Sequence, residues 1–157
     1  MKIILFSRPL TLAHKEQIVE IFSAISHYGF DFAVNSEVCQ QIELFTGKAI
    51  RAEQIYGQSV GATDDEAVMV CYGGDGTLLE GIHRLAESNI PVVGINSGRL
   101  GFLSLAQSSE IDDVFSQIAS RTLLIEQRTL VEVSGLLEDC NTTIYALNEV
   151  AVCCTLG

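Results

Sequence analysis

The chain has 157 residues, 48% of them hydrophobic, and carries a net charge of −11 from 20 acidic and nine basic residues. This length allows one domain, or one domain and part of another, with a sizeable core. The acidic balance argues against nucleic acid and anionic membranes as partners, because both require a basic surface. No apolar run is long enough to cross a bilayer, and five cysteines without CxxC spacing are typical of reduced thiols in the cytoplasm.

Buried strands alternate with amphipathic helices over most of the sequence. Residues 3–6 are all apolar, as expected for a strand covered on both faces. A stripe at helical spacing then predicts a helix that ends at Gly29. The members of this stripe are Ile18, Ile21, Phe22 and Ile25. Residues 31–35 predict a second strand, and Ser36 is a candidate N-cap for a second helix. We expect this helix to bury Val38, Ile42 and Phe45.

Residues 46–66 hold three glycines and an acidic end without a sustained period, and they predict a long surface loop. Residues 68–72 and 90–95 predict two further strands. Between them, a helical stripe consists of Leu78, Leu79, Ile82, Leu85 and Ala86. The last helix has a candidate capping box that begins at Ser109. We expect it to bury Ile111, Val114, Phe115 and Ile118.

This order of elements predicts an α/β fold, a Rossmann-like parallel sheet flanked by helices. After residue 121 the pattern changes, and residues 123–134 and 142–155 predict two strands with no helix between them. A lone hairpin is only marginally stable. We therefore expect residues 1–122 to form an α/β nucleotide-binding domain and residues 123–157 to be the first strands of an incomplete β domain.

The run Gly73-Gly74-Asp75-Gly76-Thr77 follows a predicted strand and opens a predicted helix. Glycines at such a turn let backbone N–H groups approach a phosphate. Asp75 is then a candidate general base toward a hydroxyl group, and Thr77 a candidate helix cap that also offers a hydroxyl. The alternative is a tight turn in which Asp75 is a plain N-cap. The run has neither the lysine of a P-loop nor the spacing GxGxxG.

Two further segments are candidate ligand contacts. Residues 94–103 form a glycine-containing segment at the end of the next predicted strand. Because the ends of neighbouring parallel strands share a crevice, Asn96 and the backbone after it can face the same ligand as Asp75. Phe102 can then supply an apolar wall for that ligand. Asn148 and Glu149 interrupt an apolar run and suit the two hydroxyls of a ribose. For residues 94–103, the alternative is that the glycines only shape a turn and that Phe102 belongs to the core. For Asn148 and Glu149, the alternative is a bulge or an edge position in a strand. The three histidines show no ligand spacing, so we expect no metal site built by the protein.

Three motifs together resemble the NAD kinase family. They are GGDGT at residues 73–77, PVVGINSGRLGFL at residues 91–103 and LNEVAV at residues 147–152. GGDGT also occurs in diacylglycerol and sphingosine-type lipid kinases, and phosphofructokinases have a close relative of it. The lipid kinases carry a GTxND-like stretch where this chain reads GINSGRLGFL. The resemblance covers nearly the whole chain and implies the N-terminal fold shared by NAD kinase and diacylglycerol kinase.

The resemblance implies an ATP-dependent NAD kinase, which transfers the γ-phosphoryl group of ATP, or inorganic polyphosphate in some members, to the 2′-hydroxyl of the adenosine ribose of NAD and yields NADP. It implies Asp75 as the proton acceptor. The residues that it implies for nucleotide binding are Gly74, Asp75, Gly76, Thr77, Leu79, Phe102, Asn148 and Glu149. It also implies Mg²⁺ or another divalent cation with ATP, and a cytoplasmic homo-oligomer, either a dimer or a tetramer.

Family members continue into a complete β-rich second domain, so we expect this fragment alone to be inactive. A lipid or sugar kinase that shares GGDGT is one alternative function. A nucleotide-sensing module without catalysis, in which Asp75 is only a cap, is another.

Overall fold

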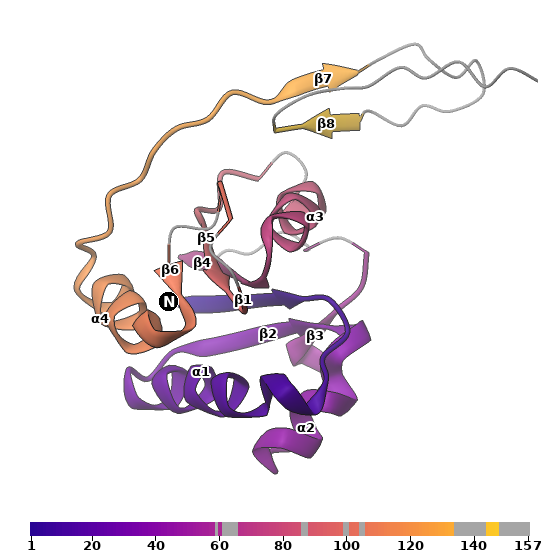
Figure 1. Ribbon diagram of the computed structural model, residues 1–157, viewed down its shortest axis with the longest axis vertical. Helices are drawn as coiled ribbons and strands as arrows, with labels where there is room; N and C mark the ends of the chain where they lie inside the picture. Colours follow the sequence, from indigo (N-terminus) through magenta and orange to yellow (C-terminus); the bar gives the residue numbers. More distant parts are fainter. Residues whose placement is uncertain are drawn as a thin grey trace, which may run out of the picture. The chain divides into compact units, whose positions relative to one another are not determined.

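The computed structural model describes residues 1–58, 60, 66–85, 88–98, 101–103, 106–133 and 144–147. The chain divides into two compact units, Met1–Ile125 and Glu126–Gly157. The first unit is a parallel β-sheet covered by helices (Figure 1). The second unit contains an antiparallel pair, β7 (Val131–Val133) and β8 (Ile144–Ala146). No helix within the described part of the chain is long and apolar enough to span a membrane.

Six parallel strands form the sheet of the first unit, in the order β3-β2-β1-β4-β5-β6. The four inner strands confirm the predicted ones: β1 (Lys2–Ser7), β2 (Asp31–Asn35), β4 (Ala67–Gly73) and β5 (Val92–Asn96). The edge strands, β3 (Ile55–Tyr56) and β6 (Ala106–Gln107), were not predicted. Because β3 falls within residues 46–66, the prediction of one long surface loop there is wrong in part. A two-residue strand is too short to show a period of two.

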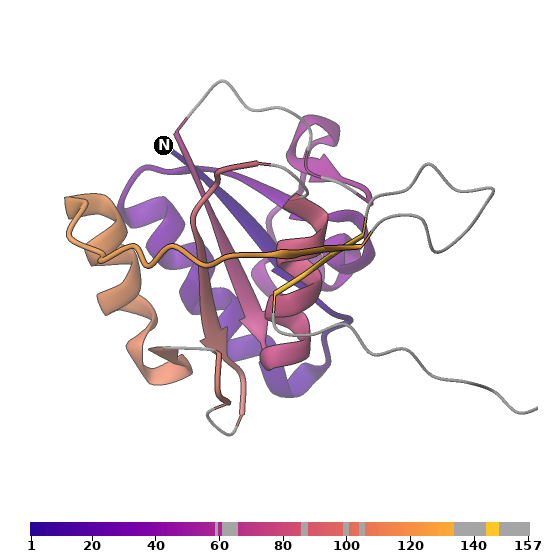
Figure 2. The same cartoon turned by 90° about the horizontal axis from the view of Figure 1, so that it is seen from above.

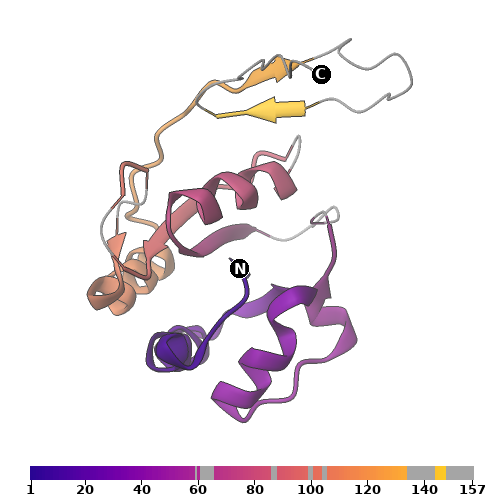
Figure 3. The same ribbon diagram turned by 45° about the vertical axis from the view of Figure 1, so that its right-hand side comes forward.

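Helices cover both faces of this sheet. One face carries α1 (Lys15–His27), α2 (Cys39–Thr46) and α4 (Ile111–Ser120), and the other carries α3 (Asp75–Leu85). Figure 2 shows α4 beside α1, and Figure 3 shows α1 and α3 on opposite sides of the sheet. Side chains alternate between the faces of a strand, so β1 buries residues on both sides and its apolar run is continuous.

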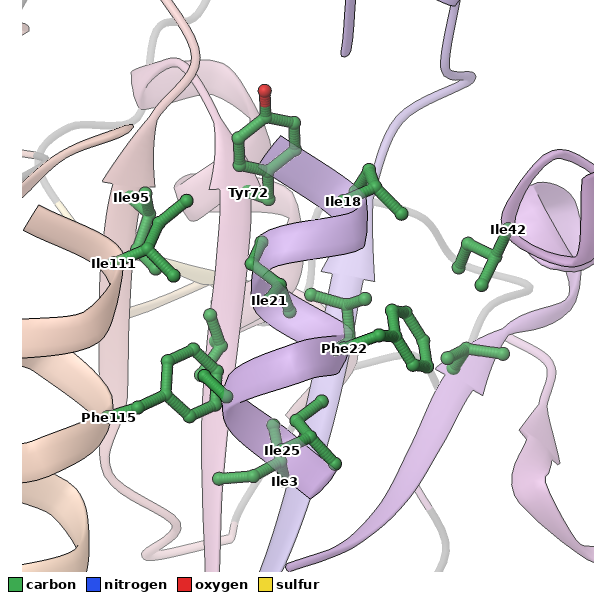
Figure 4. Close-up of a cluster of buried hydrophobic side chains, with 14 of the residues drawn as sticks. Ile3, Ile18, Ile21, Phe22, Ile25, Ile42, Tyr72, Ile95, Ile111 and Phe115 are labelled. Carbon is green, nitrogen blue, oxygen red and sulfur yellow. The ribbon is translucent and has the colours of Figure 1, made fainter. Parts of the chain in front are cut away.

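The predicted apolar stripes form the core. Figure 4 shows side chains of α1 and α4, among them Ile21 and Phe115, meeting those of the sheet. The predicted stripes of α1, α2 and α4 are all buried. Gly29 follows α1 with a φ of +67°, a left-handed conformation that suits glycine at a helix end. In α3 the predicted stripe is helical through Leu85, with Leu79 at 37% exposure, and Ala86 lies outside the described residues.

The predicted caps of two helices are wrong. Ser36 begins a 3₁₀ turn, η2 (Ser36–Val38), and α2 starts after it without a side-chain cap hydrogen bond. Ser109 lies inside another 3₁₀ turn, η4 (Ser108–Glu110), where the N–H of Gln107 donates to the Glu110 carboxylate at 2.7 Å. In both helices the 3₁₀ turn forms the first hydrogen-bonded turn, which moves the helix start along the chain.

After residue 121 the described residues form shorter strands than the sequence predicts. The predicted strand over residues 123–134 is confirmed only at β7, and residues 122–130 form no strand. Leu124 and Ile125 are 98% and 70% exposed. The predicted hairpin pairing is confirmed, with Glu132 opposite Tyr145. Most of the second predicted strand lies outside the described residues.

Candidate functional site

The carboxyl ends of β1, β4 and β5 lie together at one edge of the sheet, because these strands are parallel neighbours. The order of the chain reverses between β1 and β4, the position where open α/β sheets usually bind ligands. Buried polar residues gather there. The Asn35 side chain accepts from the N–H of Ser7 at 3.2 Å and donates to the Ser7 carbonyl at 3.0 Å, which ties the ends of β1 and β2 together.

The GGDGT run is the turn between β4 and α3. Gly73 ends β4, and a Cβ atom there would collide with the Thr77 side chain. Thr77 is buried in the first turn of α3, and its N–H donates to the Gly74 carbonyl at 2.9 Å. The prediction that Thr77 caps the helix is wrong, because α3 begins at Asp75. The N–H of Ser97 donates to the Gly73 carbonyl at 3.2 Å and joins this turn to the loop after β5.

The Asp75 carboxylate is held by that second loop. The N–H of Phe102 donates to Oδ2 at 2.8 Å and the N–H of Leu103 donates to Oδ1 at 3.2 Å. Gly101 permits this approach, since a Cβ atom there would lie 2.5 Å from Cγ and 2.6 Å from Oδ2 of Asp75. Asp75 is therefore more than a plain helix cap, because its carboxylate joins the two loops that the sequence expected to share a crevice.

Two exposed apolar residues are neighbours of Asp75, one along α3 and the other through a hydrogen bond to the Asp75 carboxylate. Leu79 is one helical turn after Asp75 and therefore on the same side of α3. Phe102, whose backbone binds the Asp75 carboxylate, is fully exposed in the described structure. The alternative that Phe102 belongs to the core is thus wrong. Exposed apolar groups beside a polar turn are typical of ligand contacts.

The other predicted ligand contacts have different outcomes. The side chain of Asn96 is buried and accepts from the N–H of Gly98 at 2.9 Å, so it shapes the turn after β5. Asn148 and Glu149 lie outside the described residues, and their contact with a ribose stays a prediction.

A cluster of two arginines and two glutamates, which the sequence did not reveal, fixes α3 beside the turn. Arg8 donates to Glu80 at 2.9 Å and to the Gly76 carbonyl at 3.2 Å. The Arg84 side chain is 7% exposed and pairs with both Glu80 and Glu37 at 2.9 Å. Its guanidinium also lies 4.7 Å from the centre of the Phe6 ring and donates to the Gly57 carbonyl.

The charges of this cluster are mutually stabilised. Hydrogen bonds from Arg84 and then Arg8 lower the pKa of Glu80, although partial burial opposes the shift. The hydrogen bonds from Glu80 and Glu37 raise the pKa of Arg84 against its desolvation. The only local signal of this cluster is the spacing of four between Glu80 and Arg84, which places them on one side of a helix.

A cleft of about 120 Å³ opens at the ends of β1 and β4, beside the turn. Its walls include Arg8, His14, Tyr72, Gly74 and Thr77. A larger hollow of about 410 Å³ borders α1 and α2 and shares no residue with the turn. The smaller cleft is the one at the reversal of strand order, so we assign it to the candidate site. Within the described ranges, no group of three or more His, Cys, Asp or Glu side chains gathers as a metal site.

Comparisons with known proteins agree with this arrangement. The family described as ATP-NAD kinase N-terminal domain matches residues 4–122. A NAD kinase of Bacteroides fragilis is 24% identical over 152 residues, which are 97% of this chain and 51% of that protein. A NAD kinase of Paraburkholderia phymatum is 32% identical over 139 residues, 87% of this chain and 44% of that protein.

A crystal structure of yeast NADH kinase with NADH is similar in fold, with a TM-score of 0.70 and 25% sequence identity. The similarity covers 93% of this chain and 46% of the yeast chain. The chain spans about half the length of the curated relatives named above. The family match covers most of the α/β unit, including both loops that hold Asp75. The chain belongs to the NAD kinase family.

Proposed function

We propose that this protein phosphorylates the 2′-hydroxyl of the adenosine ribose of NAD to give NADP, with ATP or inorganic polyphosphate as the donor. The observation that carries the proposal is the Asp75 carboxylate, which two backbone N–H groups hold at the carboxyl ends of β4 and β5. In phosphoryl transfer the protein mainly positions the reactants and stabilises charge, and one carboxylate accepts the proton of the attacking hydroxyl.

The hydrogen bonds to Asp75 are compatible with that role. A carboxylate has about four lone-pair sites, so an oxygen that accepts a backbone N–H can also accept the ribose hydroxyl. The two N–H donors restrict the carboxylate to one orientation, and a general base has to be within hydrogen-bonding reach of the proton that it removes. Gly74 and Gly76 are exposed and leave the backbone of the turn accessible to a nucleotide.

The apolar and polar contacts of NAD follow from the same turn. We assign Leu79 and Phe102 to the adenine, because both are exposed and adjacent to the turn. We assign Asn148 and Glu149 to the ribose hydroxyls on the resemblance of their motif to the family. A divalent cation would arrive with ATP and be held mainly by its phosphates, since the described residues offer no cluster of three ligands. A cytoplasmic homo-oligomer belongs to the same proposal.

The test is NADP formation from NAD and Mg-ATP, by the chain alone and by the chain fused to the C-terminal half of a curated relative. We expect turnover in the fused form only. Asp75→Asn should lower kcat by about 10² to 10⁴ with little change in the affinity for NAD. Asp113→Asn is the matched control, because Asp113 is an exposed carboxylate in the first turn of α4.

Two results would contradict the proposal. Full turnover by Asp75→Asn would assign Asp75 a structural role, as in a nucleotide-sensing module. Transfer to a lipid or sugar but not to NAD would assign the chain to the other kinases that share GGDGT.

A further inference from the structure

An ion pair joins the end of β1 to α3 beside the turn that carries Asp75. Nε of Arg8 donates to Oε2 of Glu80 at 2.9 Å, and Nη2 of the same guanidinium donates to the Gly76 carbonyl at 3.2 Å. A Cβ atom at Gly76 would lie 3.4 to 3.7 Å from Nη1, Nη2 and Cζ of Arg8. The guanidinium therefore lies against the residue that directly follows Asp75 in the chain.

The backbone around Asp75 depends on contacts from outside the turn. Gly74 and Gly76 flank this residue, and a glycine restricts its own φ and ψ less than any residue with a Cβ atom. The loop after β5 provides contacts to the carboxylate, through the N–H groups of Phe102 and Leu103. Arg8 provides a contact of another kind, because it binds the backbone of the turn at the Gly76 carbonyl.

Glu80 is fixed on its other side, which sets the direction of Arg8. Its Oε1 accepts from Nη2 of Arg84 at 2.9 Å, so the two carboxylate oxygens bind two different guanidinium groups. The Arg84 side chain is 7% exposed and also donates to Glu37 at 2.9 Å and to the Gly57 carbonyl at 3.1 Å. A carboxylate held at both oxygens cannot rotate freely, so the guanidinium of Arg8 has one favoured position.

The geometry of Arg8 matters more than its contribution to stability. The Arg8 side chain is 58% exposed and that of Glu80 is 33% exposed, and ion pairs this accessible add little to the stability of a fold. The planar fork of an arginine binds two acceptors in a fixed geometry, which the single ammonium group of a lysine does not reproduce. Arg8 uses this property, because it binds a carboxylate and a backbone carbonyl at once.

We propose that Arg8 is a positioning residue for the carboxylate of the turn. Aligned by Glu80, its guanidinium fixes the Gly76 peptide and thereby the direction in which the neighbouring Asp75 side chain leaves the turn. The catalytic consequence rests on the proposed function, in which Asp75 accepts the proton of the ribose hydroxyl. The restraint of the turn by Arg8 is a property of the chain itself and can be tested without turnover.

Hydrogen exchange in the 157-residue chain tests the restraint. Arg8→Lys keeps the charge but loses the fork. We expect exchange about fivefold faster at the N–H groups of Thr77 and Leu78, because the turn loses one hydrogen bond. Both N–H groups donate to the Gly74 carbonyl, at 2.9 and 3.2 Å. Arg51→Lys is the matched control, because Arg51 is an exposed arginine that also pairs with a glutamate, and it should leave these rates unchanged.

The kinetic test uses the form fused to the C-terminal half of a curated relative. Arg8→Lys should lower kcat for NADP formation roughly 10- to 100-fold, because a misplacement of about 1 Å costs up to that factor. The KM values for NAD and Mg-ATP should stay within about twofold, since binding of the reactants is retained. The melting temperature should fall by less than about 4 °C, because the ion pair is accessible to solvent. Arg51→Lys should change none of these quantities.

Glu80→Gln tests whether Arg8 acts through its partner. This variant removes the charge that aligns Arg8, so it should lower kcat as Arg8→Lys does, at a temperature where all variants are folded. Because the two residues act as one unit, the double variant should be no slower than the slower single variant. Losses that multiply in the double variant would overturn the alignment of Arg8 by Glu80.

Three results with Arg8→Lys would overturn the positioning role. They are wild-type exchange rates in the turn, a wild-type kcat, and a loss of activity confined to the KM for Mg-ATP. A fused wild-type protein that makes no NADP would refute the proposed function instead. The exchange rates of the chain would then still decide whether Arg8 restrains the turn.

Discussion

Gly81 allows α3 to lie close to the sheet, and replacing it with alanine should separate the two. A Cβ atom at Gly81 would collide with Sγ of Cys71 and lie 3.1 Å from Cδ1 of Phe6 and 3.2 Å from Sδ of Met69. Cys71 is a buried residue of β4 and cannot move away easily. Overpacking of this severity costs about 3 kcal/mol. Alanine in place of glycine inside a helix recovers about 1 kcal/mol, so we expect a net loss of about 2 kcal/mol.

The assay is thermal unfolding followed by circular dichroism, in which a loss of this size lowers the melting temperature by roughly 5 to 10 °C. Gly76→Ala is the control in the same helix, because the nearest atom to its Cβ would be Nη1 of Arg8 at 3.4 Å. We expect Gly76→Ala to be neutral or slightly stabilising.

A double-mutant cycle with Cys71→Ala locates the collision. Cys71→Ala alone should cost about 1 kcal/mol for the space that it leaves. In the double variant, the methyl group that Gly81→Ala introduces occupies the space that the Cys71 side chain leaves. The double variant should therefore be more stable than Gly81→Ala alone. Strict additivity, or a Gly81→Ala variant as stable as the wild type, would refute close packing of α3 at this point.

Three further outcomes test the site and the cluster that supports it. On the proposed function, Gly101→Ala should speed hydrogen exchange at the backbone amides that bind the Asp75 carboxylate. It should also lower NADP formation by the fused form about 100-fold, because a misplacement of about 1 Å has that effect. Gly98→Ala, whose Cβ meets nothing within 4 Å, should change neither, and equal effects of the two variants would contradict the role of the loop. Arg84→Met should lower the free energy of unfolding, measured in urea, by about 2 to 3 kcal/mol, because it leaves partly buried carboxylates without their cation. Arg51→Met is the control and should change this free energy by less than about 0.5 kcal/mol, because its ion pair is exposed. The pKa of Glu80 lies below its ordinary value of 4.5, so Glu80 stabilises the fold above that pH and loses this effect as the pH falls through its folded pKa. The melting temperatures of Glu80→Gln and the wild type should therefore differ at pH 7 and converge in acid, and a gap that persists in acid would contradict this cause.

The parts of the fold that the sequence predicted are those with long apolar runs. Strands buried on both faces, such as β1 and β4, leave continuous apolar stretches, and three of the four helices show complete stripes. The edge strands β3 and β6 pair through two residues each, and this is too little for a pattern. Their pairing depends on the neighbouring strands β2 and β5, so only the assembled sheet reveals them.

The sequence predicted those parts of the candidate site that the order of the parallel strands brings together. Parallel neighbours end at one edge of a sheet, which is why Asp75 and the loop of Phe102 were expected to meet. The bond between Arg8 and Glu80 joins residues 72 positions apart, and no local pattern indicates it.

The charges beside the turn balance one another, although the chain as a whole is acidic. Arg8 shares Glu80 with Arg84, and Glu37 pairs with Arg84, so the formal charges of this cluster sum to zero. On the proposed function, binding of a nucleotide phosphate at the turn then depends on fixed backbone N–H donors more than on net charge, and fixed dipoles are effective where water is excluded. The Asp75 carboxylate, in turn, is held by the N–H groups of Phe102 and Leu103. On the proposed function, one glycine-rich turn thus offers backbone N–H groups to a nucleotide phosphate and a fixed carboxylate to the ribose hydroxyl.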